Sequence, residues 1–341
     1  MPASVETISI NNRRYLGNKF KLLSFIKEVV SNNCPEITSF ADLFAGTGAV
    51  ASGFSNEHSI ITNDILYCNY ICNFAWFSSI GFDQRKIQDF IATYNTLKIT
   101  QPNYMSRNFA DTYFSKTDCK KIGFIRDDIE QKFLSQEINE RERAILIMSL
   151  IYGMDRIAKT CGHYDAYRKG VEFDEHLVLK LPLVPQNNNP QNICYNEDIN
   201  ILVKRITADV VYLDPPYNSR QYCDAYHLLE NVARWEKPKL TGVAKKMDRS
   251  NLKSSYCNKN AIIAFEDLIK NISAKYILLS YNNMSDKGND RSNARMKDCD
   301  IIRILNEKGG VKIFEQDYKA FSTGKSDIKD NKERLFLCIC K

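Results

Sequence analysis

The chain has 341 residues, of which 44% are hydrophobic and 26% are charged. This balance is typical of a folded globular protein and excludes a disordered or fibrous chain. The net charge of +6 permits a polyanionic partner. The first residues contain no apolar signal core, and no run reaches the ~18 apolar residues of a membrane span. We therefore predict a cytoplasmic protein without a membrane partner.

The eleven cysteines are scattered, and none forms the C-x-x-C pair that zinc sites use. Reduced, mostly buried thiols are the expected state. No metal cofactor is expected.

The first part of the chain has the pattern of alternating strands and helices. The predicted elements are an amphipathic helix over 22–30, a buried strand over 37–44, a glycine turn at 46–48, a helix from Ala49, a strand over 59–62 and a helix over 67–80. Strands that alternate with helices predict a parallel α/β sheet.

Residues 81–192 have helical periodicity, clearest at 142–155, and end in the Pro/Asn-rich segment PQNNNPQN. We predict an inserted, largely helical domain here, between two parts of one core at 1–80 and 193–341. Further strands are predicted over 210–213, 276–280, 311–314 and 335–340, the last two as a C-terminal hairpin.

The segment DLFAGTGAV, residues 42–50, forms the glycine turn between a strand and a helix. Glycines there let the backbone approach a ligand, beside the positive helix N-terminus. The two glycines and Ala51 also satisfy a dinucleotide pattern, so a nicotinamide enzyme is a competing interpretation. The Asp42 carboxylate favours the ammonium of a methionine moiety instead. Asp64, after the next strand, suits two ribose hydroxyls or a helix N-cap.

A second buried strand leads into Asp214-Pro215-Pro216-Tyr217 at the carboxyl edge of the sheet, where ligands of open α/β folds bind. Adenine N6 is a poor nucleophile because its lone pair is delocalised into the ring. If the Asp214 carboxylate and the Pro215 carbonyl each accept one N6 hydrogen, the lone pair turns toward a methyl sulfonium. Tyr217 would stack on an adenine flipped out of the duplex. Alone, the tetrapeptide also fits a simple proline turn.

In order, YLGNK, DLFAGTGAV, ND, NED and DPPYNSRQY resemble the motifs of the D12-class DNA adenine-N6 methyltransferases. The resemblance implies a Rossmann-like core, with a seven-stranded, mostly parallel sheet and a C-terminal β-hairpin, and an inserted target-recognition domain. It implies S-adenosylmethionine as methyl donor, S-adenosylhomocysteine as product and double-stranded DNA as substrate. It also implies pairing with a restriction endonuclease, and we expect a monomer or weak dimer.

The resemblance carries over to individual residues. Asp214, Pro215, Pro216 and Tyr217 are expected to be catalytic. The residues expected around the cofactor are Tyr15, Lys19, Asp42, Phe44, Ala45, Gly46, Thr47, Gly48, Asp64, Ile65, Asp198, Ile199 and Asp214. Lys19 is expected to meet the cofactor carboxylate or a DNA phosphate. Asp198 is expected to meet the cofactor adenine, with a cap of a helix over 199–206 as its alternative.

Two segments have the composition of DNA-contacting loops. Residues 162–169 mix aromatic and basic groups, and residues 234–256 have a basic excess. An ordinary solvated surface loop is an open alternative for each. The residues predicted to contact DNA are His163, Tyr164, Tyr167, Arg168, Lys169, Arg220, Tyr222, Lys245, Lys246 and Arg249.

Other functions stay open at this point. An N4-cytosine DNA methyltransferase would share the geometry, but Ser usually replaces Asp before its prolines. A ribosomal RNA methyltransferase can use the same tetrapeptide, although the long insertion and the RQY continuation favour DNA. A DNA-binding protein without catalysis would not need Asp42, Asp214 and Tyr217.

Overall fold

The computed structural model describes residues 6–174, 176–216, 219–282, 295–317 and 332–341. The helices are α1 (Leu23–Asn33), α2 (Ala49–Phe54), α3 (Tyr67–Phe77), α4 (Gln84–Thr96), α5 (Tyr104–Phe109), α6 (Lys116–Leu134), α7 (Glu140–Ile157), α8 (Ile199–Leu202), α9 (Tyr222–Ala225), α10 (His227–Arg234), α11 (Ala261–Asn271) and α12 (Asp298–Lys308). The strands are β1 (Thr7–Ile8), β2 (Ser39–Asp42), β3 (Ser59–Asn63), β4 (Leu181–Pro182), β5 (Ile193–Tyr195), β6 (Thr207–Leu213), β7 (Ser273–Asn282), β8 (Gly309–Asp317) and β9 (Lys332–Cys340).

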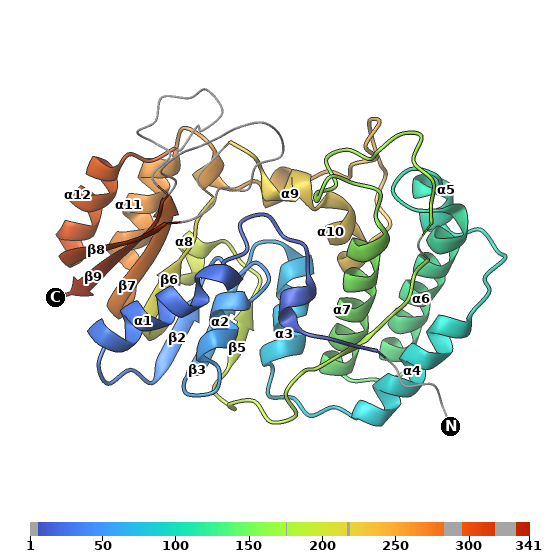
Figure 1. Ribbon diagram of the computed structural model, residues 1–341, viewed down its shortest axis with the longest axis horizontal. Helices are drawn as coiled ribbons and strands as arrows, with labels where there is room; N and C mark the ends of the chain where they lie inside the picture. The colour runs from blue at the N-terminus through green and yellow to red at the C-terminus, as the bar shows by residue number, and fades with distance from the viewer. Residues whose placement is uncertain (1–5, 175, 217–218, 283–294, 318–331) are drawn as a thin grey trace.

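Seven strands form one sheet in the order β5-β3-β2-β6-β7-β9-β8 (Figure 1). Neighbours from β5 to β7 pair in parallel, whereas β9 runs antiparallel to both β7 and β8. The predicted mostly parallel sheet and the predicted C-terminal hairpin are therefore confirmed. The carboxyl ends of the parallel strands lie along one edge, where ligands of such sheets bind.

Alternate residues of the central strands point to opposite faces of the sheet. Phe40 and Tyr212 belong to a core that includes the buried faces of α1, α2 and α3. Their neighbours Ala41 and Val211 belong to a second core with α8, α11 and α12. The central strands are thus covered on both faces, which explains their continuous apolar runs.

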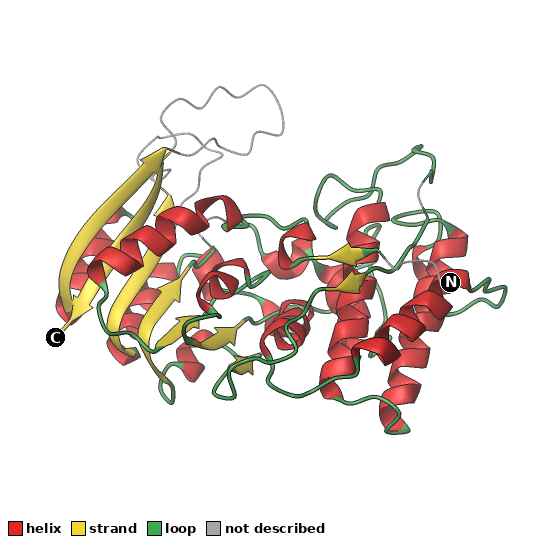
Figure 2. Ribbon diagram, turned by 60° about the horizontal axis from the view of Figure 1, so that its bottom comes forward, coloured by secondary structure: helices red, strands yellow, loops and turns green. Residues whose placement is uncertain are grey.

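Helices α4 to α7 lie beyond the β5 edge of the sheet, at the end of the molecule opposite to the β8–β9 hairpin (Figures 1 and 2). The core that contains Phe40 continues through α3 into α6 and α7. The Asn-rich segment before β5 is fixed to this core: the Asn192 side chain accepts from Ile60 N at 2.7 Å and donates to the Phe77 carbonyl at 3.0 Å. The domain boundaries at 80/81 and 192/193 stay a prediction.

Helix α3 is capped by a residue from another helix. The buried carboxylate of Glu230, in α10, accepts from Tyr67 N at 3.0 Å and from Cys68 N at 2.8 Å. These are backbone donors of the first turn, which have no partner within the helix. Glu230 therefore ties α10 to the N-terminal end of α3. Within the described ranges, none of the helices has the length and apolar character to cross a membrane.

Candidate active site

A pocket opens at the carboxyl edge of the sheet, where β2, β3 and β6 end. Its volume is about 1010 Å³, counting the part that is open to solvent. Every residue predicted to surround the cofactor lines this main pocket, with the exception of Gly48. Residues far apart in the sequence thus meet at one site, while their individual roles in binding stay a prediction.

The turn between β2 and α2 depends on two glycines. Gly46 has a φ of 52° and Gly48 a φ of 79°, which other L-residues rarely adopt. A Cβ on Gly46 would lie 2.9 Å from Cε1 of Tyr15, and a Cβ on Gly48 would lie 2.3 Å from Oδ1 of Asn73. Glycine is therefore required at both positions, and the Tyr15 ring covers the turn.

Asp42 lies at the end of β2 with only 1% of its surface exposed. Its Oδ2 accepts from Ala51 N at 3.2 Å, whereas Oδ1 has no hydrogen-bond partner among the described residues. Burial raises the pKa of Asp42 to about 8. An unpaired, buried carboxylate oxygen at a pocket wall is a suitable acceptor for a ligand ammonium, because ionisation then gains a counter-ion.

Asp64 organises the turn as well as lining the pocket. Its Oδ2 accepts from Gly46 N at 2.9 Å and from Asn69 Nδ2 at 3.0 Å, and its Oδ1 accepts from Leu66 N at 2.8 Å. Burial raises the pKa of Asp64 to about 6, and these hydrogen bonds oppose the rise. The N-cap of α3 is Leu66 and not Asp64, so the carboxylate connects the glycine turn to the β3–α3 loop.

Asp198 caps the short helix α8, since its Oδ1 accepts from Asn200 N at 2.9 Å. The helix ends at Leu202, earlier than the predicted residue 206, because β6 already begins at Thr207. Asp198 is exposed at the rim of the main pocket. It therefore remains accessible to a ligand while it caps the helix.

Asp214 directly follows β6, and its carboxylate forms an ion pair with Lys19. The Lys19 Nζ lies 2.9 Å from Oδ1 of Asp214. Burial raises the pKa of Asp214 to about 6, the Lys19 ammonium opposes this rise, and Glu333 adds to it. Among its described contacts, Lys19 therefore meets a carboxylate of the protein itself, which the sequence did not predict.

The rest of the tetrapeptide is only partly described. Pro215 is buried, and Pro216 lines the main pocket. Tyr217, predicted to stack on the target base, lies outside the described residues. The position of the corner after β6 is therefore given by Asp214 and the two prolines.

Aromatic rings form one side of the pocket. Tyr15 stacks on Tyr226, with centroids 4.6 Å apart and planes 10° from parallel, and Tyr222 lies 5.6 Å from Tyr15. Tyr222 was predicted to contact DNA, and it lines the main pocket. A second aromatic pair lines the same pocket, with Phe44 edge-on to Tyr256 at a centroid distance of 5.2 Å. No role was predicted from the sequence for Tyr226, which supports the Tyr15 ring from behind, or for Tyr256, which lines the pocket.

The predicted DNA-contacting loop over 162–169 has side chains of mixed exposure. Arg168 and Lys169 are exposed, as is Arg220 beyond the β6 corner, whereas His163 and Tyr167 are half-buried. Tyr164 is only 2% exposed, and its hydroxyl donates to Oδ1 of Asp155 at 2.8 Å. A DNA contact by Tyr164 is therefore wrong for this structure, because its ring anchors the loop in the core.

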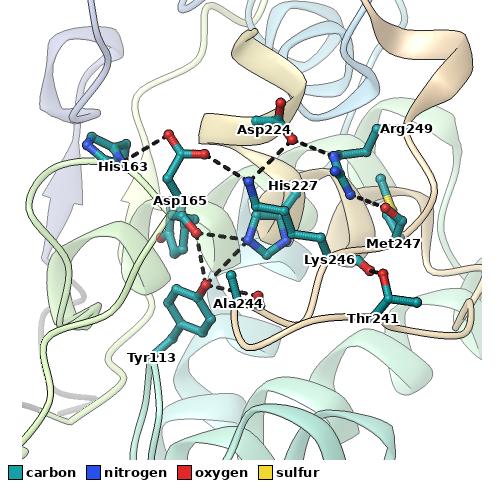
Figure 3. A network of polar contacts seen from close by, with 11 residues as sticks. Tyr113, His163, Asp165, Asp224, His227, Thr241, Ala244, Lys246, Met247 and Arg249 are labelled. Atoms are coloured by element: carbon teal, nitrogen blue, oxygen red, sulfur yellow. Dashed lines mark hydrogen bonds and ion pairs between the residues drawn. The ribbon is translucent and has the colours of Figure 1, made fainter. Parts of the chain in front are cut away.

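A polar network joins this loop to the loop over 241–249 (Figure 3). Lys246 Nζ lies 3.0 Å from Oδ1 of Asp165 and 3.3 Å from Oδ1 of Asp224, and Arg249 Nε lies 2.8 Å from the same Asp224 oxygen. The two cations were predicted to meet DNA phosphates. The structure instead pairs both with carboxylates of the protein. Lys245, the third cation of that prediction, is half-buried.

The buried side of the network contains two residues that the sequence did not single out. The Tyr113 hydroxyl lies 2.9 Å from the Tyr164 carbonyl and 3.0 Å from the Ala244 carbonyl. His227 Nε2 lies 2.8 Å from the same Tyr164 carbonyl. Burial lowers the pKa of His227 to about 4, so the imidazole is neutral near pH 7 and its Nε2–H donates to that carbonyl.

The strand order, the glycine turn and the acidic pocket together define a Rossmann-like methyltransferase fold, a class whose cofactor is S-adenosylmethionine. The residues present fit this cofactor, because Asp42 offers an unpaired buried oxygen to its ammonium. No cluster of three or more His, Cys, Asp or Glu side chains suited to a metal occurs in the part of the chain that the structure describes.

The model of the D12 class N6 adenine-specific DNA methyltransferase family matches residues 15–290, and the chain belongs to this family. Modification methylase StsI of Streptococcus sanguinis is 35% identical over 94% of this chain and 50% of its own length. Modification methylase LlaI of Lactococcus lactis subsp. lactis is 31% identical over 94% of this chain and 53% of its own. The chain thus spans about half the length of these two relatives.

Type II methyltransferase M.NlaIII of Neisseria lactamica is 31% identical over 93% of this chain and 95% of its own length. The crystal structure of magnesium protoporphyrin IX methyltransferase from Synechocystis PCC 6803 has a TM-score of 0.32 and 8% identity, over 94% of this chain and 82% of that chain. This likeness is too distant to inform the site.

Proposed function

We propose that the chain is a site-specific DNA methyltransferase that acts on the N6 amine of an adenine flipped out of the duplex. The observation that carries this proposal is the position of Asp214, whose carboxylate lies at the wall of the main pocket beside Lys19. The family membership and the names of the relatives support it. The same names support a place in a restriction–modification system, paired with an endonuclease.

The residues around Asp214 can prepare an amine for methylation. The ion pair with Lys19 occupies Oδ1, and we assign Oδ2 to one amine hydrogen and the Pro215 carbonyl to the other. Both acceptors sit on a corner fixed by two prolines, so little reorganisation is needed when they bind the amine. The nitrogen lone pair is then directed toward the cofactor, which supplies the methyl group when bound.

The cofactor is held by residues of three strand ends in this proposal. Asp42 binds the ammonium of the methionine moiety through its unpaired oxygen. Asp64 and Asp198 meet the ribose and the adenine, and the backbone of the glycine turn passes close to the methionine moiety because Gly46 and Gly48 carry no side chain.

The helical region over 81–192 is the proposed target-recognition domain. Exposed cations stand on its loop at Arg168 and Lys169 and beyond the β6 corner at Arg220. In this proposal these cations meet the phosphates that flank a flipped base. In this proposal, side chains of this surface enter a groove of the DNA and determine the recognition sequence.

Transfer of a labelled methyl group from S-adenosylmethionine tests the proposal directly. Duplex DNA and ribosomal RNA are compared as acceptors, and digestion to nucleosides identifies the product. We expect N6-methyladenine in DNA, with loss of at least about 100-fold in rate for Asp214→Ala. Asp89→Ala, at an exposed position on α4, is the control and should keep full activity. N4-methylcytosine, or transfer to RNA alone, would refute the proposal.

A further inference from the structure

Lys19 is shared by two carboxylates at the pocket wall. Its Nζ lies 2.9 Å from Oδ1 of Asp214 and 3.6 Å from Oε1 of Glu333. The side chains of Lys19, Asp214 and Glu333 are 7%, 18% and 8% exposed. One ammonium therefore serves two anions where water screens their charges only weakly.

Glu333 is held in place by the sheet. It stands in β9 opposite Asn282 of the antiparallel partner β7. The hydroxyl of Ser280, which is fully buried, donates to Oε1 of Glu333 at 2.8 Å. The oxygen that faces Lys19 is therefore fixed by strand register and by a hydrogen bond.

We propose that Glu333 is a positioning residue for the methyl transfer: it holds the Lys19 ammonium against Oδ1 of Asp214 and leaves Oδ2 to the substrate amine. This inference rests on the proposed function. It adds a residue from the C-terminal hairpin, a part of the chain in which the sequence predicted no site residue. Glu333 touches neither the amine nor the cofactor in this arrangement and acts through Lys19.

The charges around Asp214 give Glu333 a measurable signature. Lys19 attracts its negative charge, Glu333 and Asp42 repel it, and the hydroxyl of Tyr212, in the preceding strand β6, lies near it. The negative charge of Glu333 raises the pKa of Asp214. An ionised Asp214 carboxylate can only accept hydrogen bonds from the amine, whereas a protonated one also presents a donor. The rate should therefore fall as the pH falls through the pKa of Asp214.

Replacement of Glu333 by Gln removes the charge and keeps the shape. We expect kcat to fall roughly 10- to 100-fold, because Lys19 loses its second anchor and the acceptor geometry loosens. The acid limb of the kcat–pH profile should move to lower pH by about 0.5 to 1 unit, because Asp214 ionises more easily without a neighbouring anion. The KM for duplex DNA should change by less than about 2-fold.

Two further variants complete the test. Glu333→Asp restores the charge, so the acid limb should return to its wild-type position. Glu315→Gln removes an anion of the same hairpin that is paired with Lys332 at the surface, and it should leave both kcat and the limb unchanged. Ser280→Ala, which frees Glu333 from its hydrogen bond, replaces Glu333→Gln if that variant does not fold, and it should lower kcat while DNA affinity is kept.

For Glu333→Gln, a fall in kcat with an unmoved acid limb would overturn the proposal, since a merely structural role predicts that result. For Ser280→Ala, which keeps the charge of Glu333, an unchanged kcat would overturn it. An unchanged kcat in Glu333→Gln would overturn it as well. Failure of the proposed function is distinguishable, because the wild-type protein would then form no N6-methyladenine in DNA at any pH.

Discussion

Asp42 is the last residue of strand β2, and Asp209 of the neighbouring strand β6 lies at the first residue of β2. The pKa values of the two carboxyl groups are shifted in opposite directions. Burial raises the pKa of Asp42 to about 8. Burial also acts to raise the pKa of Asp209, but an ion pair with Lys275 and hydrogen bonds from Thr38 and Ser39 hold it well below its usual range. The ionised form of Asp42, at the pocket, is therefore unfavourable without a ligand. The ionised form of Asp209, at the other end of β2, is stabilised by its partners within the protein.

Asp42→Asn should stabilise the cofactor-free protein and weaken cofactor binding. At pH 7 the unfolded chain has an ionised Asp42 while the folded protein holds a proton there, so stability falls as pH rises from about 4 toward 8. The amide removes this cost, on the order of 4 kcal/mol at pH 7. Thermal unfolding and calorimetric titration with S-adenosylmethionine measure the two effects. Equal or tighter cofactor binding would contradict the assigned role of Asp42.

Asp209→Asn should have the opposite effect on stability and none on the cofactor. The ionised carboxylate accepts hydrogen bonds from Thr38 N at 2.7 Å and from Thr38 Oγ1 at 2.8 Å. Because its folded pKa is lowered, the stabilisation is present above pH ~4 and is lost as the pH falls below that value. We expect a loss of about 1–3 kcal/mol near pH 7, measured by denaturant unfolding, and an unaltered cofactor Kd.

Gly46→Ala should damage the cofactor site through sterics. The new methyl group would meet the Tyr15 ring at 2.9 Å, and the φ of 52° is itself strained for alanine, at about 1–2 kcal/mol. Gly170→Ala is the matched control, since its φ is 69° but the added Cβ meets nothing within 4 Å. Both variants should lose stability, and only Gly46→Ala should also lose cofactor affinity. Equal cofactor affinities in the two variants would show that the Tyr15 ring moves aside for the methyl group without disturbing the cofactor site.

Exposed and paired cations should differ in the salt dependence of DNA binding. Replacing Arg168 and Lys169 by Gln should weaken binding and lower the slope of log Kd against log salt by about 2. Replacing Lys246 and Arg249 should mainly lower the thermal stability, because Asp224 and Asp165 lose their partners. The slope then stays near the wild-type value. A larger change in slope for the second pair would show that these cations transfer to phosphates when DNA binds.

The sequence predicted the parts of the fold in which local pattern and environment agree. The glycine turn between β2 and α2, the β6 corner and the β8–β9 hairpin were found because each has a local pattern that packing does not override. The end of α8 was misplaced because β6 follows after only a short turn. Helix α10 was missed because it has only eight residues, although its apolar residues have helical spacing.

The ion-pair and hydrogen-bond partners of several residues could not be predicted from the sequence, because they come from distant parts of the chain. Lys246 lies 81 positions from Asp165 in the chain, and a basic segment read alone predicts free cations. Glu333 likewise meets Lys19 only when β9 takes its place beside β7. The burial of Tyr164 follows from contacts with Asp155 and the Ala225 carbonyl, which no local pattern indicates.

The cap that Glu230 provides for α3 has a mechanical consequence. If α10 were to shift away, two N–H groups of α3 would lose their acceptor, at a cost of about 1–3 kcal/mol for the buried one at Cys68. We therefore expect the two helices to move together. Helix α3 carries Asn69, which donates to Asp64, and α10 follows Tyr226, which stacks on Tyr15. We therefore expect a displacement of Tyr226 to be transmitted through the two helices to Asp64.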